Sequence, residues 1–470
     1  MRVKFSMNQV NITGAAMIEK LKRLLQKVDA DYADIRYEVR IDNALHLSNE
    51  ELTSVTSSST DGYVIRVLKG GGFSAVSFTS LVDAEKAIKS ALESAIVMGK
   101  YRKKPVKLAA IDVVKDHFKP PIVEDPREVS MDEKISLMKK YVRIPLQQEK
   151  IINVELGYAD IIREKYFVSS EGSEIFEELV TTVLSGDIKS KSGNVIQNVR
   201  ISAGGSDGFQ NIRGQEDNFA KRAGIAVDLL SAEPIKGGKY NCILNHMMTG
   251  VFTHEAFGHF SEADLIESLP AMRDKMEIGS KLGSDLVNII DDATQEGLLG
   301  FYKYDDEGVT VRKVQLMQNG VLTGRLHSRR TGVDFDEPVS GHNIAEDFRY
   351  APIIRMGTIY IDKGEDSFEE LLHKLGDGIY LCDPKGGQTA GENFTFGAQY
   401  GYEVKDGKLG KMVRDINVSG NLYETLQNIA AIGDDLQFTK RGGCGKGQTN
   451  IRSCFGGPQI IVKNLVIGGN

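Results

Sequence analysis

The sequence predicts an α+β protein, with an N-terminal region of sheet and helices followed by a mostly antiparallel β C-terminal domain. Helical and strand-like hydrophobic patterns occur together without strict alternation, which favours this class. The hairpin turn signals Asn319-Gly320 and Asp406-Gly407 lie in the second half. The 470 residues, 41% hydrophobic and 26% charged, are typical of a globular chain of two or three domains.

The first hundred residues carry the patterns of a sheet with helices. Residues 15–28 place Met17, Leu21 and Leu24 at helical spacing, with Lys and Glu on the other face. Residues 33–40 alternate apolar and charged side chains, as in a half-buried strand. Further expected elements are strands at 63–68 and 73–78, a Ser/Thr-rich loop at 56–60 and a helix at 84–96.

A linker and a boundary follow. Residues 100–127 are basic, then contain prolines, and are expected to form an irregular crossing. Ser130 and Glu133 form a capping-box pattern for a helix that ends or kinks near Pro145. Strands are expected over 151–201 and a helix over 216–230. Because Pro234 and Gly237-Gly238 mark the clearest boundary, we divide the chain into residues 1–231, with a candidate split near 100–130, and 232–470.

The second half is expected to contain mostly strands. It begins with a strand at 240–244 and a helix from His246. Residues 309–317 and 321–326 flank Asn319-Gly320 as a hairpin. Ser367 and Glu370 predict the start of a short helix. A second helix is expected over 422–432, stopped by Gly433.

Composition excludes several classes of protein. The net charge of −7 argues against a nucleic-acid-binding surface. Four cysteines are too few for a disulfide framework, so a reducing, cytoplasmic location is expected. No run of about 18 apolar residues predicts a membrane span, and residues 1–14 lack the apolar core of a signal peptide.

One constellation could carry chemistry: the run Thr253-His254-Glu255-Ala256-Phe257-Gly258-His259. Zinc hydrolases space their two helical histidines by four, with a glutamate beside the first. Here the spacing is five, which on a regular helix leaves the rings about 140° apart, rather than about 40°. A π-turn around residues 255–258, eased by Gly258, would realign them. We therefore predict a π-turn or a break around residues 255–258; a straight α-helix would leave two polar residues on a partly exposed face.

A catalytic zinc site needs a third protein ligand. From the residues alone the candidates are Glu262, His327, His342, Cys444 and Cys454. Cys444 lies in a glycine-dense loop, residues 442–447, which lets a thiolate approach a metal closely. The other cysteines, Cys242 and Cys382, are expected in the core.

Two other motifs are weaker. The Gly-Lys-Gly at 445–447 is not a phosphate-binding loop, since Gln448 follows where that motif needs Ser or Thr. The acidic run Asp305-Asp306-Glu307 could bind a cation, but a solvated turn is the favoured interpretation.

In these motifs the sequence resembles the TldD/PmbA family of bacterial and archaeal proteins, formerly called modulators of DNA gyrase. The matching residues are His254 to His259 with Glu262 and Asp264, Asp305-Asp306-Glu307-Gly308, Asn319-Gly320-Val321-Leu322, Pro352-Ile353-Ile354-Arg355-Met356, Gly386-Gly387-Gln388, Cys444-Gly445-Lys446-Gly447-Gln448 and Asn464-Leu465-Val466-Ile467-Gly468-Gly469. They span most of residues 240–470 in order. The N-terminal match is looser.

The resemblance implies a zinc metalloprotease of the TldD type. His254, His259 and Cys444 would be zinc ligands, and Glu255 the general base. Cys454 is not part of the pattern. Substrates would be peptides or unfolded segments cleaved with little sequence preference, by a homodimer or by a heterodimer with a paralogue that lacks the motif. One departure is Ser340-Gly341-His342-Asn343, where relatives often carry a basic stretch.

Two rival interpretations remain at this stage. The chain could be a non-enzymatic binding or regulatory subunit, which would have no need of Glu255 as a base. Alternatively, its metal site could be structural, so that removing zinc would unfold the second domain.

Overall fold

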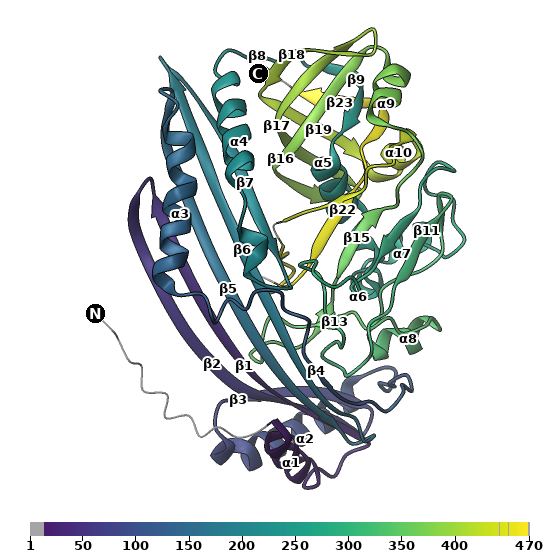
Figure 1. Ribbon diagram of the computed structural model, residues 1–470. Helices are drawn as coiled ribbons and strands as arrows, with labels where there is room; N and C mark the ends of the chain where they lie inside the picture. The colour runs from purple at the N-terminus through teal and green to yellow at the C-terminus, as the bar shows by residue number, and fades with distance from the viewer. Residues whose placement is uncertain (1–13, 441, 450, 469–470) are drawn as a thin grey trace.

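The computed structural model describes residues 14–440, 442–449 and 451–468 (Figure 1). It is an α+β protein, as predicted. Its N-terminal half is one large sheet with helices, and its C-terminal half is built around two further sheets. No helix in the described ranges is long and apolar enough to cross a membrane.

The N-terminal sheet has the strand order β3-β2-β1-β5-β6-β4, with β7 also paired to β6. All of its neighbours are antiparallel except β4 and β6. Its strands are β1 (Tyr32–Ser48), β2 (Glu51–Lys69), β3 (Gly72–Phe78), β4 (Lys115–Phe118), β5 (Ile151–Ser169), β6 (Glu174–Ser192) and β7 (Val195–Gly205).

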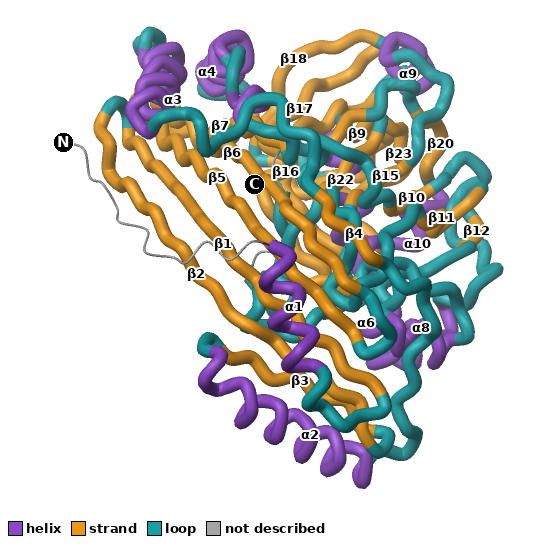
Figure 2. The backbone as a smooth tube through the Cα atoms, turned by 60° about the horizontal axis from the view of Figure 1, so that its bottom comes forward, coloured by secondary structure: helices purple, strands orange, loops and turns teal. Residues whose placement is uncertain are grey.

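Four helices pack on this sheet (Figure 2). They are α1 (Gly14–Leu25), α2 (Ala84–Tyr101), α3 (Met131–Leu146) and α4 (Glu216–Asp228). Helix α2 packs on β3 and β2, α1 on β5 and β1, α3 on β5, and α4 on β7 and β6. The predicted N-cap of α3 is confirmed, since the Ser130 side chain accepts a hydrogen bond from the Glu133 amide. Pro145 lies in the last turn of α3.

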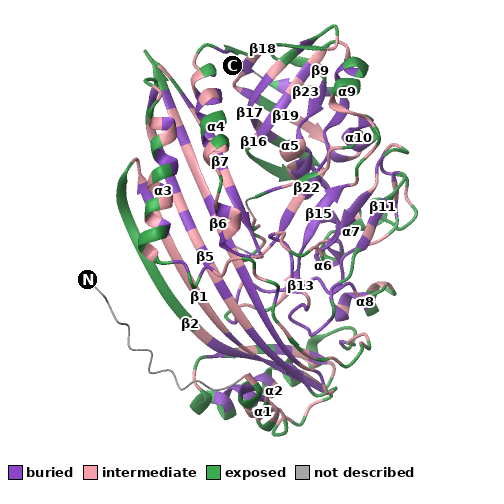
Figure 3. Ribbon diagram, in the orientation of Figure 1, coloured by how far each residue is buried: buried purple, intermediate pink, exposed green. Residues whose placement is uncertain are grey.

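The Ser/Thr-rich segment predicted as a loop is instead part of a strand. Residues 51–60 form the outer half of β2 and pair with β1, whereas β3 pairs only with residues 63–69. All ten are exposed, as Figure 3 shows along the sheet's outer edge. Because both faces are exposed, the segment lacks the apolar alternation by which strands are recognised.

The larger C-terminal sheet has the order β16-β9-β23-β19-β17-β18-β8, with β20 paired to β23 and with β16 also paired to β17. Its strands are β8 (Glu233–Pro234), β9 (Gly238–Leu244), β16 (Gly378–Ala390), β17 (Asn393–Lys405), β18 (Lys408–Arg414), β19 (Ile416–Asn421), β20 (Ile429–Ile432) and β23 (Ile460–Gly468). The extra β16–β17 pairing closes five of these strands into a ring.

The smaller sheet has the order β12-β11-β10-β15-β22-β21. Its strands are β10 (Ile289–Asp291), β11 (Val314–Gln318), β12 (Val321–Leu322), β15 (Thr358–Ile361), β21 (Gln437–Phe438) and β22 (Cys454–Gly457); β13 (Asn343–Ile344) and β14 (Ile353–Ile354) pair separately. The helices of this half are α5 (His246–Val251), α6 (Ala263–Ser268), α7 (Pro270–Lys275), α8 (Arg329–Phe335), α9 (Phe368–Leu375) and α10 (Leu422–Gln427).

Both predicted hairpin turns are confirmed. Asn319 and Gly320 have φ of 47° and 72°, and Asp406 and Gly407 have φ of 50° and 70°, as a turn with two left-handed residues requires. The helix predicted over 422–432 is wrong in its second half. It ends at Gln427, and β20 follows because Ile429 and Ile432 pair with β23.

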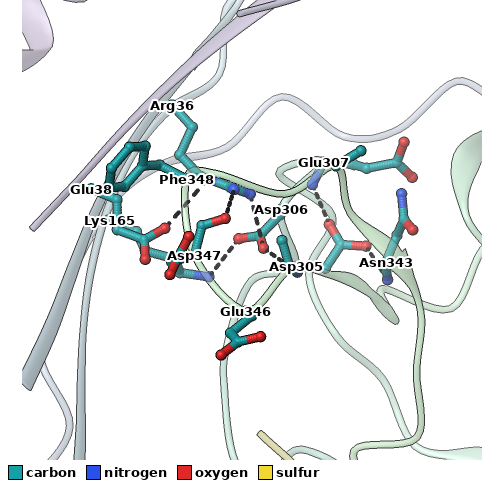
Figure 4. Close-up of polar contacts among 12 residues, drawn as sticks. Arg36, Glu38, Lys165, Asp305, Asp306, Glu307, Asn343, Glu346, Asp347 and Phe348 are labelled. Carbon is teal, nitrogen blue, oxygen red and sulfur yellow. Dashed lines mark hydrogen bonds and ion pairs between the residues drawn. The ribbon is translucent and has the colours of Figure 1, made fainter. Parts of the chain in front are cut away.

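The acidic run at 305–307 is neither a solvated turn nor a set of free carboxylates. Asp305, Asp306 and Glu307 are 2–3% exposed. Figure 4 shows Asp306 between Arg36 of β1 and Lys165 of β5: its carboxylate lies 2.8 Å from Arg36 Nη1 and 3.2 Å from Lys165 Nζ. These ion pairs join the N-terminal sheet to the C-terminal half. Because the Asp306 carboxylate is already paired with Arg36 and Lys165, it is not free to bind a metal cation.

Asp306→Asn is expected to destabilise the protein by about 3–5 kcal/mol at pH 7, because it leaves buried cations unpaired. Burial alone would raise the pKa of Asp306, but the charges of Arg36, Lys165 and Arg163 hold that pKa well below its usual range. A depressed folded-state pKa contributes stability above the unfolded pKa of about 3.9 that is lost as pH falls further. Melting temperatures at pH 7, 5, 4 and 3 should therefore fall more steeply below pH 4 in wild type than in Asp306→Asn.

The matched control for this substitution is Asp274→Asn, at an exposed aspartate of α7. Its melting curves should overlay those of wild type at every pH. Equal stability of Asp306→Asn and wild type at pH 7 would contradict the role assigned to these ion pairs.

Candidate metal centre

The helix that carries the two histidines changes its winding where the sequence predicts. Asn245 caps α5, and its side chain accepts a hydrogen bond from the Met248 amide. A π-helical turn then runs over Phe252–Phe257, and a 3-10 turn over Gly258–Ser261. The predicted π-turn is thereby confirmed, in a position that starts three residues earlier than expected.

Packing holds this irregular turn in place. Phe252 and Phe257 are fully buried in the C-terminal core, and burial of each ring contributes about 1.5–3 kcal/mol. Gly258 packs so closely on Met356 that an added Cβ would overlap the sulfur. The glycine is therefore required by tertiary contact, in addition to easing the turn.

Four side chains converge at the turn. One potential ligand atom from each of His254, Glu255, His259 and Cys444 lies within 4.8 Å of the other three. Cys444 Sγ is 3.9 Å from His259 Nε2, and Glu255 Oε2 is 3.6 Å from the same nitrogen. Although Cys444 follows His259 by 185 residues, the fold brings it to the helix.

The other candidate ligands lie elsewhere. Cys454 is fully buried, with Sγ 3.7 Å from the Thr439 carbonyl. His327 contacts Thr331 and Glu337. His342 contacts Asp291 and the Ser340 carbonyl. Cys242 and Cys382 are buried, as expected.

Glu262 lies behind the group of four rather than within it. Its Oε2 is 3.3 Å from His259 Nδ1. This contact fixes the histidine with Nδ1 as the donor and leaves Nε2 free to face Cys444. Such a carboxylate partner is the arrangement expected behind a metal-ligating histidine.

The charges at the centre suit a metal ion. Burial alone would raise the pKa of the Cys444 thiol, but hydrogen bonding to His254 and His259 outweighs burial and lowers the pKa to about 5. Conversely, Cys444, Glu255 and Glu262 raise the pKa of His259 to about 11 against the effect of burial.

The donor chemistry also fits zinc. Two imidazoles and one thiolate are ligands that zinc takes in tetrahedral sites. His254 Nδ1 is buried without a hydrogen-bond partner among the described residues, and an unpartnered buried ring nitrogen is costly unless something binds there. The site therefore has three donors suited to zinc and a carboxylate, Glu255, whose side chain is 40% exposed.

Glu255 and Cys444 open onto a cleft of about 680 Å³ between the two halves of the chain. The N-terminal wall is mostly from β5, β6 and β7, including Glu155, Asp187 and Arg200, with His46 of β1 and Arg222 of α4. The C-terminal wall includes Gly386–Gln388 of β16. Sequence reasoning missed this N-terminal wall, and no motif in residues 151–205 points to it.

Comparisons with known proteins agree with this architecture. The family model described as the PmbA/TldA metallopeptidase C-terminal domain matches residues 237–469, the domain 1 model matches residues 33–98, and the central domain model matches residues 124–231.

Curated relatives carry metalloprotease names. A metalloprotease of Methanocaldococcus jannaschii is 34% identical over 446 residues, which cover 94% of this chain and 97% of that protein. A zinc metalloprotease TldD homolog of Saccharolobus solfataricus is 31% identical, with 94% and 98% covered.

Two solved structures share the fold. A putative modulator of DNA gyrase from Thermotoga maritima aligns with a TM-score of 0.79 at 21% identity, covering 97% of this chain and all of that one. TldE from Thermococcus kodakarensis aligns with a TM-score of 0.77 at 18% identity, covering 97% and 99%.

Proposed function

The chain belongs to the PmbA/TldD family of metallopeptidases and is a peptidase. From this premise we propose that His254, His259 and Cys444 hold a zinc ion, and that Glu255 beside it acts as the general base. The observation that carries the proposal is the convergence of these four side chains within 4.8 Å at the edge of a cleft. Cys444 is preferred over Cys454 because Cys454 points into the core beside Thr439.

The reaction is peptide-bond hydrolysis. A zinc ion held by His254, His259 and Cys444 would supply Lewis acidity, making water a nucleophile near neutral pH and polarising the scissile carbonyl. Glu255 accepts the water proton and delivers it to the leaving amine. Its partly exposed carboxylate on the cleft wall suits this role. Glu262 keeps His259 oriented, and the cleft walls hold the peptide and exclude bulk water.

Substrates are peptides or unfolded segments, recognised with little sequence preference. The support is the free edge of β16. Residues 387–390 pair with β17 on one side, and among the described residues β9 pairs with β16 only at 379–381. The exposed residues Gly386–Gln388 line the same cleft as Glu255. An extended peptide could pair with this edge through main-chain hydrogen bonds, which carry affinity irrespective of side chains.

Metal removal tests the proposal. We expect about one zinc per chain, loss of cleavage of an unstructured peptide after treatment with a chelator, and recovery when zinc is added back. Peptides of scrambled sequence should be cleaved at rates within about tenfold, because the proposed pairing is sequence-independent. Cleavage that persists after complete zinc removal would contradict the proposal. Unfolding of residues 232–470 on chelation would favour a structural metal site. Binding of the peptide without cleavage would favour a non-enzymatic subunit.

The working unit is a dimer, of this chain or with a paralogue that lacks the motif. The outer half of β2 supports this proposal, because residues 51–60 pair with β1 on one side and with no other strand of the described ranges on the other. Residues 52–60 carry no charge or proline of the kind that protects such edges. Light scattering of the purified chain, alone and with such a paralogue, measures the assembly. If both samples had the mass of a single chain, the proposed dimer would be contradicted.

A further inference from the structure

Lys446 joins the loop of Cys444 to the segment that follows His259. Its ammonium lies 2.8 Å from Glu262 Oε2 and 2.8 Å and 3.0 Å from the two carboxylate oxygens of Asp264. It also donates to the Ile354 carbonyl at 3.1 Å. These four contacts, with only 24% of the side chain exposed, hold the ammonium end of Lys446 in place.

We propose that Lys446 is a positioning residue that places Cys444 at the metal centre by holding its loop against Glu262 and Asp264. The inference deepens the proposed function and rests on it, because it concerns how the third ligand reaches the zinc. Lys446 itself lies two residues from Cys444 and acts through Glu262 and the loop.

The loop needs such an anchor because its backbone is permissive. Four of the six residues at 442–447 are glycine, and Gly443 and Gly447 have φ of 97° and 69°. Glycine-rich backbone loses much conformational entropy when it is fixed in one shape. Main-chain hydrogen bonds hold the start of the loop: Cys444 and Ile451 pair at 3.0 Å in both directions, and the Gly443 amide donates to the Ser453 carbonyl at 3.2 Å. Lys446 is the only charged side chain in residues 442–447.

Glu262 connects the loop to the histidine. Its side chain is fully buried; one oxygen contacts both Lys446 and His259 Nδ1, and the other lies 3.3 Å from Arg355 Nη1. The Arg355 guanidinium is also buried, and its nitrogens make no hydrogen bond within the described part of the chain. Arg355 therefore lies beside Glu262 without a hydrogen bond, whereas Lys446 makes the directional contact with it. One carboxylate thereby sets the positions of His259 and Cys444 together.

Cobalt substitution tests the role of Lys446. In Co²⁺-loaded protein the thiolate gives a ligand-to-metal charge-transfer band, and the metal's d–d bands report the remaining ligands. Lys446→Met should lower the charge-transfer intensity, because Cys444 would ligate in a smaller fraction of the molecules, and should retain the d–d bands of bound Co²⁺, with metal affinity about 10- to 100-fold weaker by chelator competition. Lys446→Arg keeps the charge, so its charge-transfer intensity and metal affinity should lie between those of Lys446→Met and wild type. The control is Lys463→Met, at an exposed lysine of β23. Its charge-transfer band and metal affinity should equal those of wild type.

Hydrogen exchange of the metal-free proteins separates this inference from the proposed function. Lys446→Met should exchange faster than wild type over residues 443–449 whether or not zinc is the native ligand, whereas α3 should be unchanged. Unaltered exchange in the loop, or a charge-transfer band of wild-type intensity, would overturn the inference. Loss of the d–d bands together with the charge-transfer band would also overturn it, because Lys446 would then support the whole site and not the Cys444 loop.

Discussion

Glu255→Gln is expected to lower kcat for peptide hydrolysis by about 10²–10⁴-fold, the usual contribution of a general base, with zinc content unchanged. Glutamine has the shape of glutamate but cannot accept the water proton. Because Glu255 is not among the three proposed ligands, its loss should leave the metal bound. Its side chain is partly exposed, so stability should change little. Peptide cleavage by mass spectrometry and zinc by elemental analysis measure the two quantities on one preparation.

The matched control is Glu277→Gln, at an exposed glutamate just beyond α7, which should keep wild-type kcat. If Glu255→Gln retained more than about a tenth of wild-type kcat, the base would have to be another group. Loss of zinc from this variant would place Glu255 among the ligands instead.

Cys444→Ala is expected to lose both zinc and activity, whereas Cys454→Ala should keep both. Removing one of three protein ligands leaves two imidazoles, too few for a stable zinc site. Cys444 is partly exposed at the cleft, so its loss should hardly affect packing. Cys454 is fully buried, and its replacement leaves a small void in the core costing about 1 kcal/mol. The pair of variants thus separates ligation from packing.

Elemental analysis and thermal unfolding of the two variants decide between the cysteines. Zinc retained at about one per chain in Cys444→Ala would contradict the proposed ligand set. A Cys454→Ala protein that stayed folded but lost zinc would move the ligand to Cys454, which would require rearrangement of β22.

Much of the fold could be predicted from local pattern. The two turns with left-handed residues, the N-cap at Ser130 and the helices α1, α2 and α4 follow from short-range stereochemistry. The π-turn also follows locally, because a spacing of five between His254 and His259 is useful for metal binding only if the helix is rewound. Each of these features depends on residues within about ten positions of one another.

Other features could not be predicted because the partner is remote in sequence. The charged face of β1 was expected to meet solvent, yet Asp34, Arg36 and Glu38 are buried against the C-terminal half. Alternation in a strand identifies two faces but not what covers the polar one. For the same reason the acidic run at 305–307 was expected to be solvated, although it is paired with Arg36, Arg66 and Lys165.

The sequence by itself determined the class of fold, the helix of the two histidines and the short set of side chains able to complete a metal site. Only the tertiary structure decided which member of that set meets them, because His327, His342 and Cys454 are equally good donors until the fold buries them elsewhere. It also decided that β5, β6 and β7 form half of the cleft. Ligand chemistry is a property of the residue, whereas convergence within a few ångströms depends on long-range packing that no local pattern records.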